Sequence, residues 1–207
     1  LPDVARLEEA VEEQDRLGLT GEVVVPHDAV GARVHAPQAA ELIARRAEML
    51  REYQNPAYAD MYEARIARVR AAESNLGLGE QLTYAAATYL AKLMAYKDEY
   101  EVARLYTRPE YKQAVEDVFG KNTKLTFLLA PPMISKKNHK GELTKKSFGP
   151  WMMMSFKLLR KLKVLRGGSF DVFGKTEERV MERRLRDEYL ERLEKLSAGL
   201  RAENLAL

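Results

Sequence analysis

Apolar residues recur three and four positions apart along most of the chain, which is the spacing of one helix face. The pattern predicts a short amphipathic helix near the N-terminus and six further helices. Pro residues open several of these segments and Gly or Asn-Pro closes them, as is typical of helix boundaries. Thr176 precedes two glutamates and is predicted to cap the last helix. The predicted helices cover residues 3–17, 37–54, 55–76, 80–106, 108–119, 150–166 and 176–199.

Other stretches lack this period. Residues 21–37 combine β-branched side chains with Gly and Pro, which predicts a strand or small hairpin. Residues 124–132 alternate briefly before two prolines and predict an edge strand, and residues 133–149 read as a polar loop. The fold class is therefore predicted to be mainly α, a compact irregular helical bundle with a short β segment or hairpin near the N-terminus. We expect an N-terminal appendage, as linker or hairpin, over 1–36 and a helical C-terminal domain over 37–207.

Three charges interrupt the apolar stripe of the predicted helix over 80–106. The stripe reaches Leu93 and Met94 and then continues at Lys97, Glu101 and Arg104. Their spacing of four and three residues allows all three to bond along one face. Because a buried ion needs a partner, we predict a structural ion network, completed by Arg183 or Glu182 of the last helix. A contact with an anion or cofactor at a domain interface is the alternative.

The overall composition changes this picture little. The chain has 207 residues, 46% of them hydrophobic and 31% charged, which is ordinary for a globular domain. No apolar run approaches the length of a membrane span, so no membrane partner is expected. The absence of cysteine excludes disulfides and thiolate metal sites from this chain and fits a reducing, cytoplasmic location.

The charge is unevenly distributed. Residues 121–166 carry 12 Lys and Arg against a single acid, Glu142. A one-signed segment of this kind attracts acidic partners, although a solvated loop and helix face would also be basic. The segment lacks interleaved aromatic residues for base stacking, so nucleic acid is disfavoured. The predicted partner-binding basic patch consists of Lys136, Lys137, Lys140, Lys145, Lys146, Lys157, Arg160 and Lys161.

No motif for catalysis is present. The chain has no Gly-rich phosphate loop, no GxGxxG after a strand and no GxSxG elbow. The three histidines show no metal-binding spacing, and His27, Asp28 and His35 are better explained as polar loop residues. We therefore assign no catalytic residue, no metal ligand and no cofactor to this chain.

Several segments nevertheless resemble one family. "AYKDEYEVARLY", "FLLAPP", "FGPWM", "KLLRKLKVLRG" and "FDVFGKTEERVMERRL" resemble, in order and spacing, the C-terminal region of the large single-chain indolepyruvate ferredoxin oxidoreductases. The resemblance extends over residues 40–189. Leu128, Gly168 and Val172 stand where the family pattern has His, Thr and Pro, so the resemblance does not identify the 2-oxo acid.

The resemblance implies a parent enzyme that oxidises 2-oxo acids with thiamine diphosphate and passes electrons through an iron–sulfur cluster to ferredoxin. In that family the catalytic portions lie upstream of this region. This chain is then expected to be a non-catalytic accessory domain that supports domain packing or dimerisation in a homo-oligomer and docks ferredoxin. The alternative is a stand-alone binding protein that uses the basic patch for an acidic partner or nucleic acid.

Overall fold

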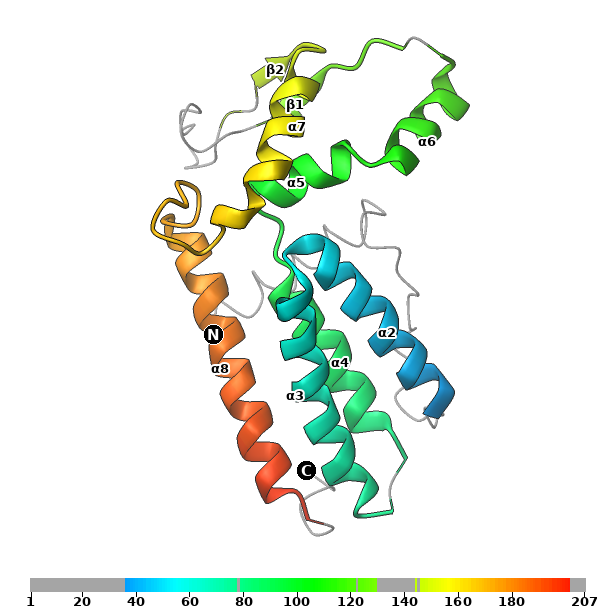
Figure 1. The fold of residues 1–207 in the computed structure, drawn as a ribbon, viewed down its shortest axis with the longest axis vertical. Helices are drawn as coiled ribbons and strands as arrows, with labels where there is room; N and C mark the ends of the chain where they lie inside the picture. The colour runs from blue at the N-terminus through cyan, green and yellow to red at the C-terminus, as the bar shows by residue number, and fades with distance from the viewer. Residues whose placement is uncertain (1–35, 78, 122, 130–143, 145, 202–207) are drawn as a thin grey trace. The chain divides into compact units, whose positions relative to one another are not determined.

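The computed structural model describes residues 36–77, 79–121, 123–129, 144 and 146–201. This part of the chain is mainly α, as predicted, with seven α-helices, one 3-10 helix and a two-stranded sheet (Figure 1). The first helix and the N-terminal hairpin predicted from the sequence lie outside the described residues, apart from the end of the hairpin segment. The elements are α2 (Ala36–Tyr53), α3 (Pro56–Ser74), α4 (Gln81–Met94), α5 (Glu99–Tyr106), α6 (Pro109–Phe119), β1 (Phe127–Leu129), β2 (Lys146–Phe148), α7 (Met152–Lys161), η2 (Leu162–Leu165) and α8 (Glu177–Gly199).

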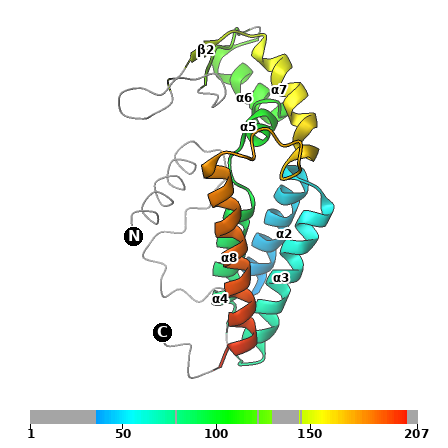
Figure 2. The same ribbon diagram turned by 90° about the vertical axis from the view of Figure 1, so that its left-hand side faces the viewer.

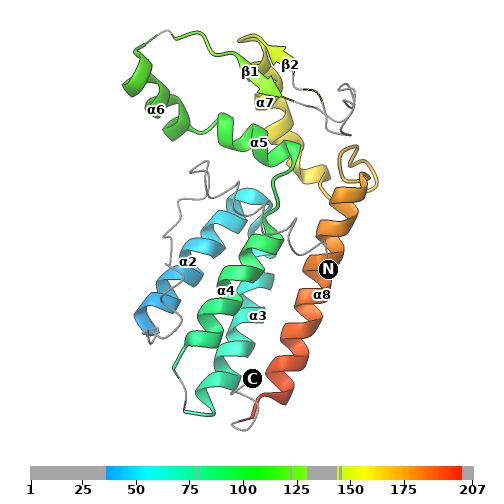
Figure 3. The same ribbon diagram turned by 180° about the vertical axis from the view of Figure 1, so that it is seen from behind.

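Four helices form a bundle. α2, α3 and α4 pack on one another, and α8 packs against α3 and α4 (Figures 2 and 3). The apolar side chains at helical spacing fill the core between them, including the fully buried Leu50, Ile66 and Leu90. Tyr62 is also buried there, and its hydroxyl donates to the carbonyl of Ala87 at 3.1 Å, so the polar atom is satisfied. Among the helices that the structure describes, none is long and apolar enough to cross a lipid bilayer.

A second, smaller core lies between α5, α7 and the sheet. Phe127 and Phe156 are buried in it, with their ring centroids 5.2 Å apart at nearly a right angle. Tyr106 stacks on Phe156 at 5.2 Å, and Met152 packs against the same cluster. Edge-to-face and stacked aromatic pairs add to the gain from burial. This core fixes α7 on α5.

The prediction of a single helix over residues 80–106 is wrong. α4 ends at Met94 and α5 begins at Glu99, with Asp98 as its N-cap, whose side chain accepts from the backbone N–H of Glu101 at 2.8 Å. Helix propensity gave no sign of the break, because residues 95–98 contain no Gly or Pro. The sequence did carry one signal, an Asp three positions before a Glu, which is a capping pattern.

The region from 124 to 166 differs from the prediction in two places. The edge strand is present as β1, but residues 146–148 of the predicted polar loop form β2, which pairs antiparallel with β1 so that Phe127 faces Phe148. The helix predicted over 150–166 ends at Lys161 and continues as the 3-10 helix η2, before Gly167 turns the chain with φ of +74°. Glycine adopts this left-handed conformation without the cost that a side chain would add.

Candidate functional site

Arg166 and Asp98 form a buried ion pair between η2 and the start of α5. Two guanidinium nitrogens lie 2.5 and 2.8 Å from the two carboxylate oxygens, and the side chains are only 5% and 4% exposed. Arg166 also donates to the backbone carbonyl of Tyr53. Its guanidinium carbon lies 3.7 Å from the centroid of the Tyr53 ring. Burial lowers the pKa of Arg166, but hydrogen bonding to Asp98, together with the electrostatic effects of Tyr53, Asp98 and Glu101, outweighs burial and the net direction is upward. The ion pair holds η2 to the start of α5, and the bond to Tyr53 holds it to the end of α2.

The in-line charges of α5 form a second buried cluster. Arg104 bonds Glu101 through two nitrogens at 2.8 and 2.6 Å, and it also contacts Glu52 of α2 at 2.5 Å. Glu101 and Arg104 are 8% and 6% exposed. The partner that completes this cluster is therefore Glu52, and neither Arg183 nor Glu182 takes that place.

The start of α8 contacts the segment just before α5. Arg179 donates to the backbone carbonyl of Lys97 at 2.9 Å and pairs with Glu182 at 2.5 Å. Burial raises the pKa of Glu182, and the neighbouring Arg179 offsets this only in part. Arg183 donates to the carbonyl of Gly174 at 2.6 Å. α8 thus contacts the Lys97 region, as predicted. The contact is a hydrogen bond from Arg179 to the backbone carbonyl of Lys97, and Arg183 and Glu182 do not make it.

Asp171 organises the loop that leads into α8. The side chain is buried and accepts hydrogen bonds from the hydroxyl of Tyr100 and from the backbone N–H groups of Gly167, Phe173 and Gly174. We refer to Asp98, Glu101, Arg104, Arg166, Asp171 and Arg179 together as the ionic junction.

Gly174 is required beside Asp171, and replacing it with alanine is expected to destabilise the protein by about 1–3 kcal/mol. A Cβ at this position would lie 2.3 Å from Oδ2 of Asp171, and four donors shared between the two oxygens hold this carboxylate in place. Urea denaturation of Gly174→Ala measures the loss. The control is Gly149→Ala, where the nearest atom to a new Cβ is 3.5 Å away. Equal stability of the two variants would show that Asp171 moves freely.

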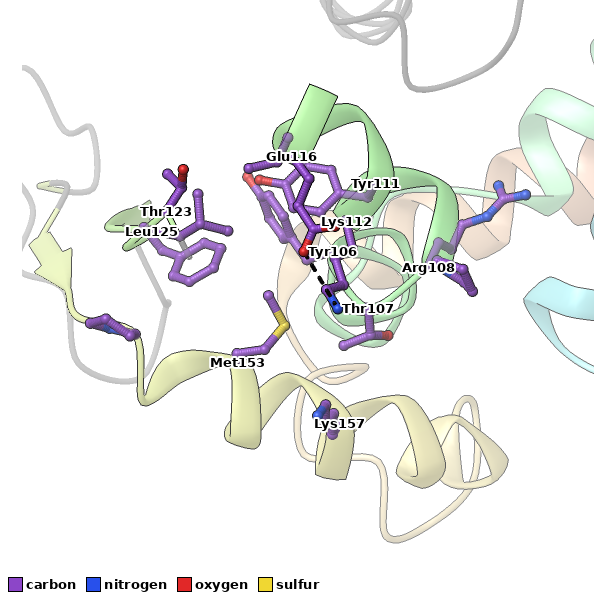
Figure 4. Close-up of a pocket in the computed structure, with 14 residues that line it drawn as sticks. Tyr106, Thr107, Arg108, Tyr111, Lys112, Glu116, Thr123, Leu125, Met153 and Lys157 are labelled. Atoms are coloured by element: carbon purple, nitrogen blue, oxygen red, sulfur yellow. Dashed lines mark ion pairs between the residues drawn. The ribbon is translucent and has the colours of Figure 1, made fainter. Parts of the chain in front are cut away.

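A cavity of about 620 Å³ lies between the end of α5, α6 and α7 (Figure 4). Tyr106 and Tyr111 point into it from α5 and α6, and Leu125, Phe127 and Met153 complete its apolar wall. The rings of Tyr106 and Tyr111 meet edge to face at 5.1 Å. Burial and the neighbouring Tyr106 raise the pKa of Tyr111.

Three cations and one carboxylate also line this cavity. Lys112 pairs with Glu116 at 3.5 Å, and Arg108 pairs with Glu110 at 3.3 Å, whereas Lys157 extends from α7. The lining contains no His or Cys. The arrangement is suited to binding an apolar group beside cations. Among the residues that the structure describes, no cluster of His, Cys, Asp and Glu is placed to hold a metal ion.

The outer face of α7 combines apolar and basic side chains. Trp151, Met154 and Leu158 are 59%, 75% and 60% exposed and recur at helical spacing, while Met152 and Phe156 on the opposite face are buried. The three successive methionines thus point in different directions: Met152 into the core, Met153 into the cavity and Met154 outward. We refer to the exposed side as the α7 outer face, formed by Trp151, Met154, Lys157, Leu158, Arg160 and Lys161.

The predicted basic patch is described only in part. Lys157, Arg160 and Lys161 lie exposed on α7, and Lys146 lies exposed on β2. The remaining members lie outside the described residues: Lys136, Lys137, Lys140 and Lys145. The structure therefore brings together the α7 cations of the patch. The side chain of Arg166, the last cation of the basic segment 121–166, is buried.

Comparison with known families assigns most of the chain. Residues 39–207 match the model of a family of unknown function, DUF6537. The chain belongs to this family. No curated protein and no solved structure matches it.

The DUF6537 region covers nearly all the residues that the structure describes. It includes the ionic junction, the cavity and the α7 outer face. Sequence reasoning identified Glu101 and Arg104 but missed Asp98, Arg166 and Asp171. Asp98 had the capping pattern as a signal, and Asp171 stands before a glycine-containing turn, but the sequence offered no local sign that Arg166 would be buried.

Proposed function

We propose that this chain is a non-catalytic accessory domain of a thiamine-diphosphate-dependent 2-oxoacid:ferredoxin oxidoreductase of the indolepyruvate type, located in the cytoplasm. It supports packing or dimerisation of the catalytic portions and docks ferredoxin. Thiamine diphosphate and the iron–sulfur cluster belong to the parent enzyme, and we assign no residue of this chain to them.

The observation that carries this proposal is the convergence of the resembling segments. "AYKDEYEVARLY" supplies Asp98, Glu101 and Arg104, "KLLRKLKVLRG" supplies Arg166, and "FDVFGKTEERVMERRL" supplies Asp171 and Arg179. Segments up to about 80 residues apart in sequence thus meet in one buried junction. Three contacts join these segments: Asp98 bonds Arg166, Asp171 accepts from Tyr100, and Arg179 donates to the carbonyl of Lys97. The segments that carry the resemblance thus belong to one packed unit, which supports the accessory-domain assignment.

The α7 outer face supports the docking role. Three large apolar side chains stand in a row, and Lys157, Arg160 and Lys161 stand among them. Exposed apolar side chains in such a row are typical of an interaction surface, and a basic rim selects an acidic partner. Ferredoxin, as a small acidic electron carrier, is the partner that this face fits within the proposed enzyme.

The size of the native protein tests the assignment to a larger enzyme. An antibody raised against this chain is expected to detect a polypeptide several times larger than 23.6 kDa in extracts of the source cell. A native band at the mass of this chain would overturn the proposal in favour of a stand-alone binding protein.

Charge reversal tests the docking role in the full enzyme. Changing Lys157, Arg160 and Lys161 to Glu is expected to slow ferredoxin reduction about tenfold or more at low ionic strength, because steering of a charged partner is lost. The difference should shrink as added salt screens the charges. Reversing three exposed cations of α8, Arg184, Arg192 and Lys195, makes the same change in net charge and is expected to leave the rate near that of the unmodified enzyme. Equal effects of the two triple variants would remove the docking role.

A further inference from the structure

A second cavity, of about 340 Å³, is lined by three arginines. Arg166 contributes to it from the end of η2, and Arg183 and Arg186 contribute from α8. Asn55 and Tyr58, at the start of α3, also line the cavity. No carboxylate is among the residues that line this cavity.

The three arginines differ in their ion-pair partners. Arg166 is neutralised by Asp98, and Arg186 contacts Asp187 at 2.7 Å. Arg183 has no carboxylate partner among the described residues, and it donates through Nη2 to the carbonyl of Gly174. The carboxylate of Asp171 lies near Arg183, since a Cβ on Gly174 would be 2.3 Å from the one and 3.3 Å from the other, but the two form no ion pair. Arg183 is therefore the one of these three arginines without an ion-pair partner among the described residues.

Arg183 also carries an unsatisfied donor. Its Nη1 is buried and has no hydrogen-bond partner. The carboxylate of Asp171, in the adjacent loop, is occupied by its four other donors. A buried polar atom without a partner is uncommon in a folded protein and calls for an explanation, such as a ligand that supplies the acceptor.

The start of α3 adds to the positive field. This helix has 19 residues, begins with Pro56 after the N-cap Asn55 and has no acidic residue in its first turn. Pro56 has no backbone N–H, and the N–H of Tyr58 is capped by the Asn55 side chain at 2.9 Å, so Ala57 carries the one N–H among the first three residues of α3 that has no acceptor within the helix. The positive end of the helix dipole thus contributes to the same cavity as the three arginines.

We infer that this cavity is a binding site for the phosphate group of a small molecule. Guanidinium groups and a helix N-terminus together are the donors that recognise tetrahedral oxyanions. The Arg183 guanidinium is assigned as the anchor, because its charge lacks a carboxylate partner. Tyr58, Met61 and Tyr96 provide an apolar lining for the remainder of the molecule, and the volume is in the range of small-molecule sites. The site is independent of the α7 outer face and does not rest on the function proposed above.

Titration of the full 207-residue chain with inorganic phosphate, pyrophosphate and adenosine monophosphate tests this site. Binding is measured by calorimetry, with sodium chloride at matched ionic strength as the reference. Saturable binding of at least one phosphate compound is expected, and tighter binding of the monoester than of free phosphate would identify an organic phosphate as the ligand class. If none binds above the chloride reference, the proposal is wrong.

Two variants on neighbouring residues locate the binding. Arg183→Gln is expected to weaken it about tenfold or more, the scale of one lost charge-assisted contact. Arg184→Gln is the matched control, because the Arg184 side chain is 78% exposed and pairs with Glu188. The affinity of this variant for the phosphate compound should equal that of the unmodified chain. Equal affinities of the two variants would place binding elsewhere and overturn the assignment.

A measurement on the unmodified protein removes any dependence on how the variants fold. The backbone amide signals of Ala57 and Gly167, both of which line the cavity, are expected to shift on addition of phosphate and not of chloride. Unshifted signals at saturating phosphate would contradict the proposal even if calorimetry detects binding.

Discussion

Replacement of Asp98 by asparagine is expected to lower the free energy of unfolding by about 3–5 kcal/mol, the usual cost of removing one partner of a buried ion pair. Arg166 would keep its charge at a site where its side chain is 5% exposed. Asparagine caps helices about as well as aspartate, so the start of α5 is retained and the loss reports the missing charge. Urea denaturation measures this loss. The comparison requires that the free energy of unfolding depend on urea concentration with the same slope in the variant and in the unmodified chain.

Two further variants distinguish the ion pair from other effects. Asp187→Asn removes a carboxylate that is 58% exposed and paired with Arg186, and it is expected to cost at most about 1 kcal/mol. Asp98→Asn combined with Arg166→Met removes the stranded cation and is expected to recover part of the loss. If Asp98→Asn unfolds at the urea concentration of the unmodified chain, the pair does not stabilise the junction.

Replacement of Phe156 by alanine is the second large effect, expected to cost about 3–5 kcal/mol. Phe156 is 3% exposed and contacts the rings of Tyr106 and Phe127, so its removal leaves a cavity at the centre of the second core. Because α7 is held on α5 by this core, the α7 outer face should lose its support as well.

The position of the single tryptophan makes this loss observable. Trp151 directly precedes α7, so its fluorescence reports on the second core, whereas far-ultraviolet circular dichroism reports on all helices. In Phe156→Ala the fluorescence transition is expected at a lower urea concentration than the loss of helix. Phe170→Ala, at a side chain that is 80% exposed, should be within about 0.5 kcal/mol of the unmodified chain. A Phe156→Ala variant as stable as Phe170→Ala would show that the second core contributes nothing.

The helices were largely predictable because their pattern is local. The segments at 55–76 and 108–119 have apolar spacing with Pro near the start, and α3 and α6 follow them closely. Thr176 was predicted as a cap and does accept from the N–H of Arg179. The strand β2 was missed, because three residues of polar and mixed character have no pattern until β1 pairs with them.

The candidate site was predictable only in part. The charges at Glu101 and Arg104 stood in line with an apolar stripe, which indicated that they would be buried and paired. Their partner from outside α5 is Glu52, which lies 52 residues before Arg104 in the chain. No local pattern in the sequence indicates this pairing. Arg166 gave no signal at all, since a cation near the end of a basic helix is ordinarily solvated.

The sequence by itself determined the helical class, most of the helix positions and the need for partners on α5, because helix periodicity and the cost of burying a charge act through neighbouring residues. Only the tertiary structure decided the pairing of Asp98 with Arg166, the choice of Glu52 as partner of Arg104 and the gathering of three arginines at the start of α3. Each of these depends on segments far apart in the chain, whose electrostatic and packing energies exist only once the segments meet.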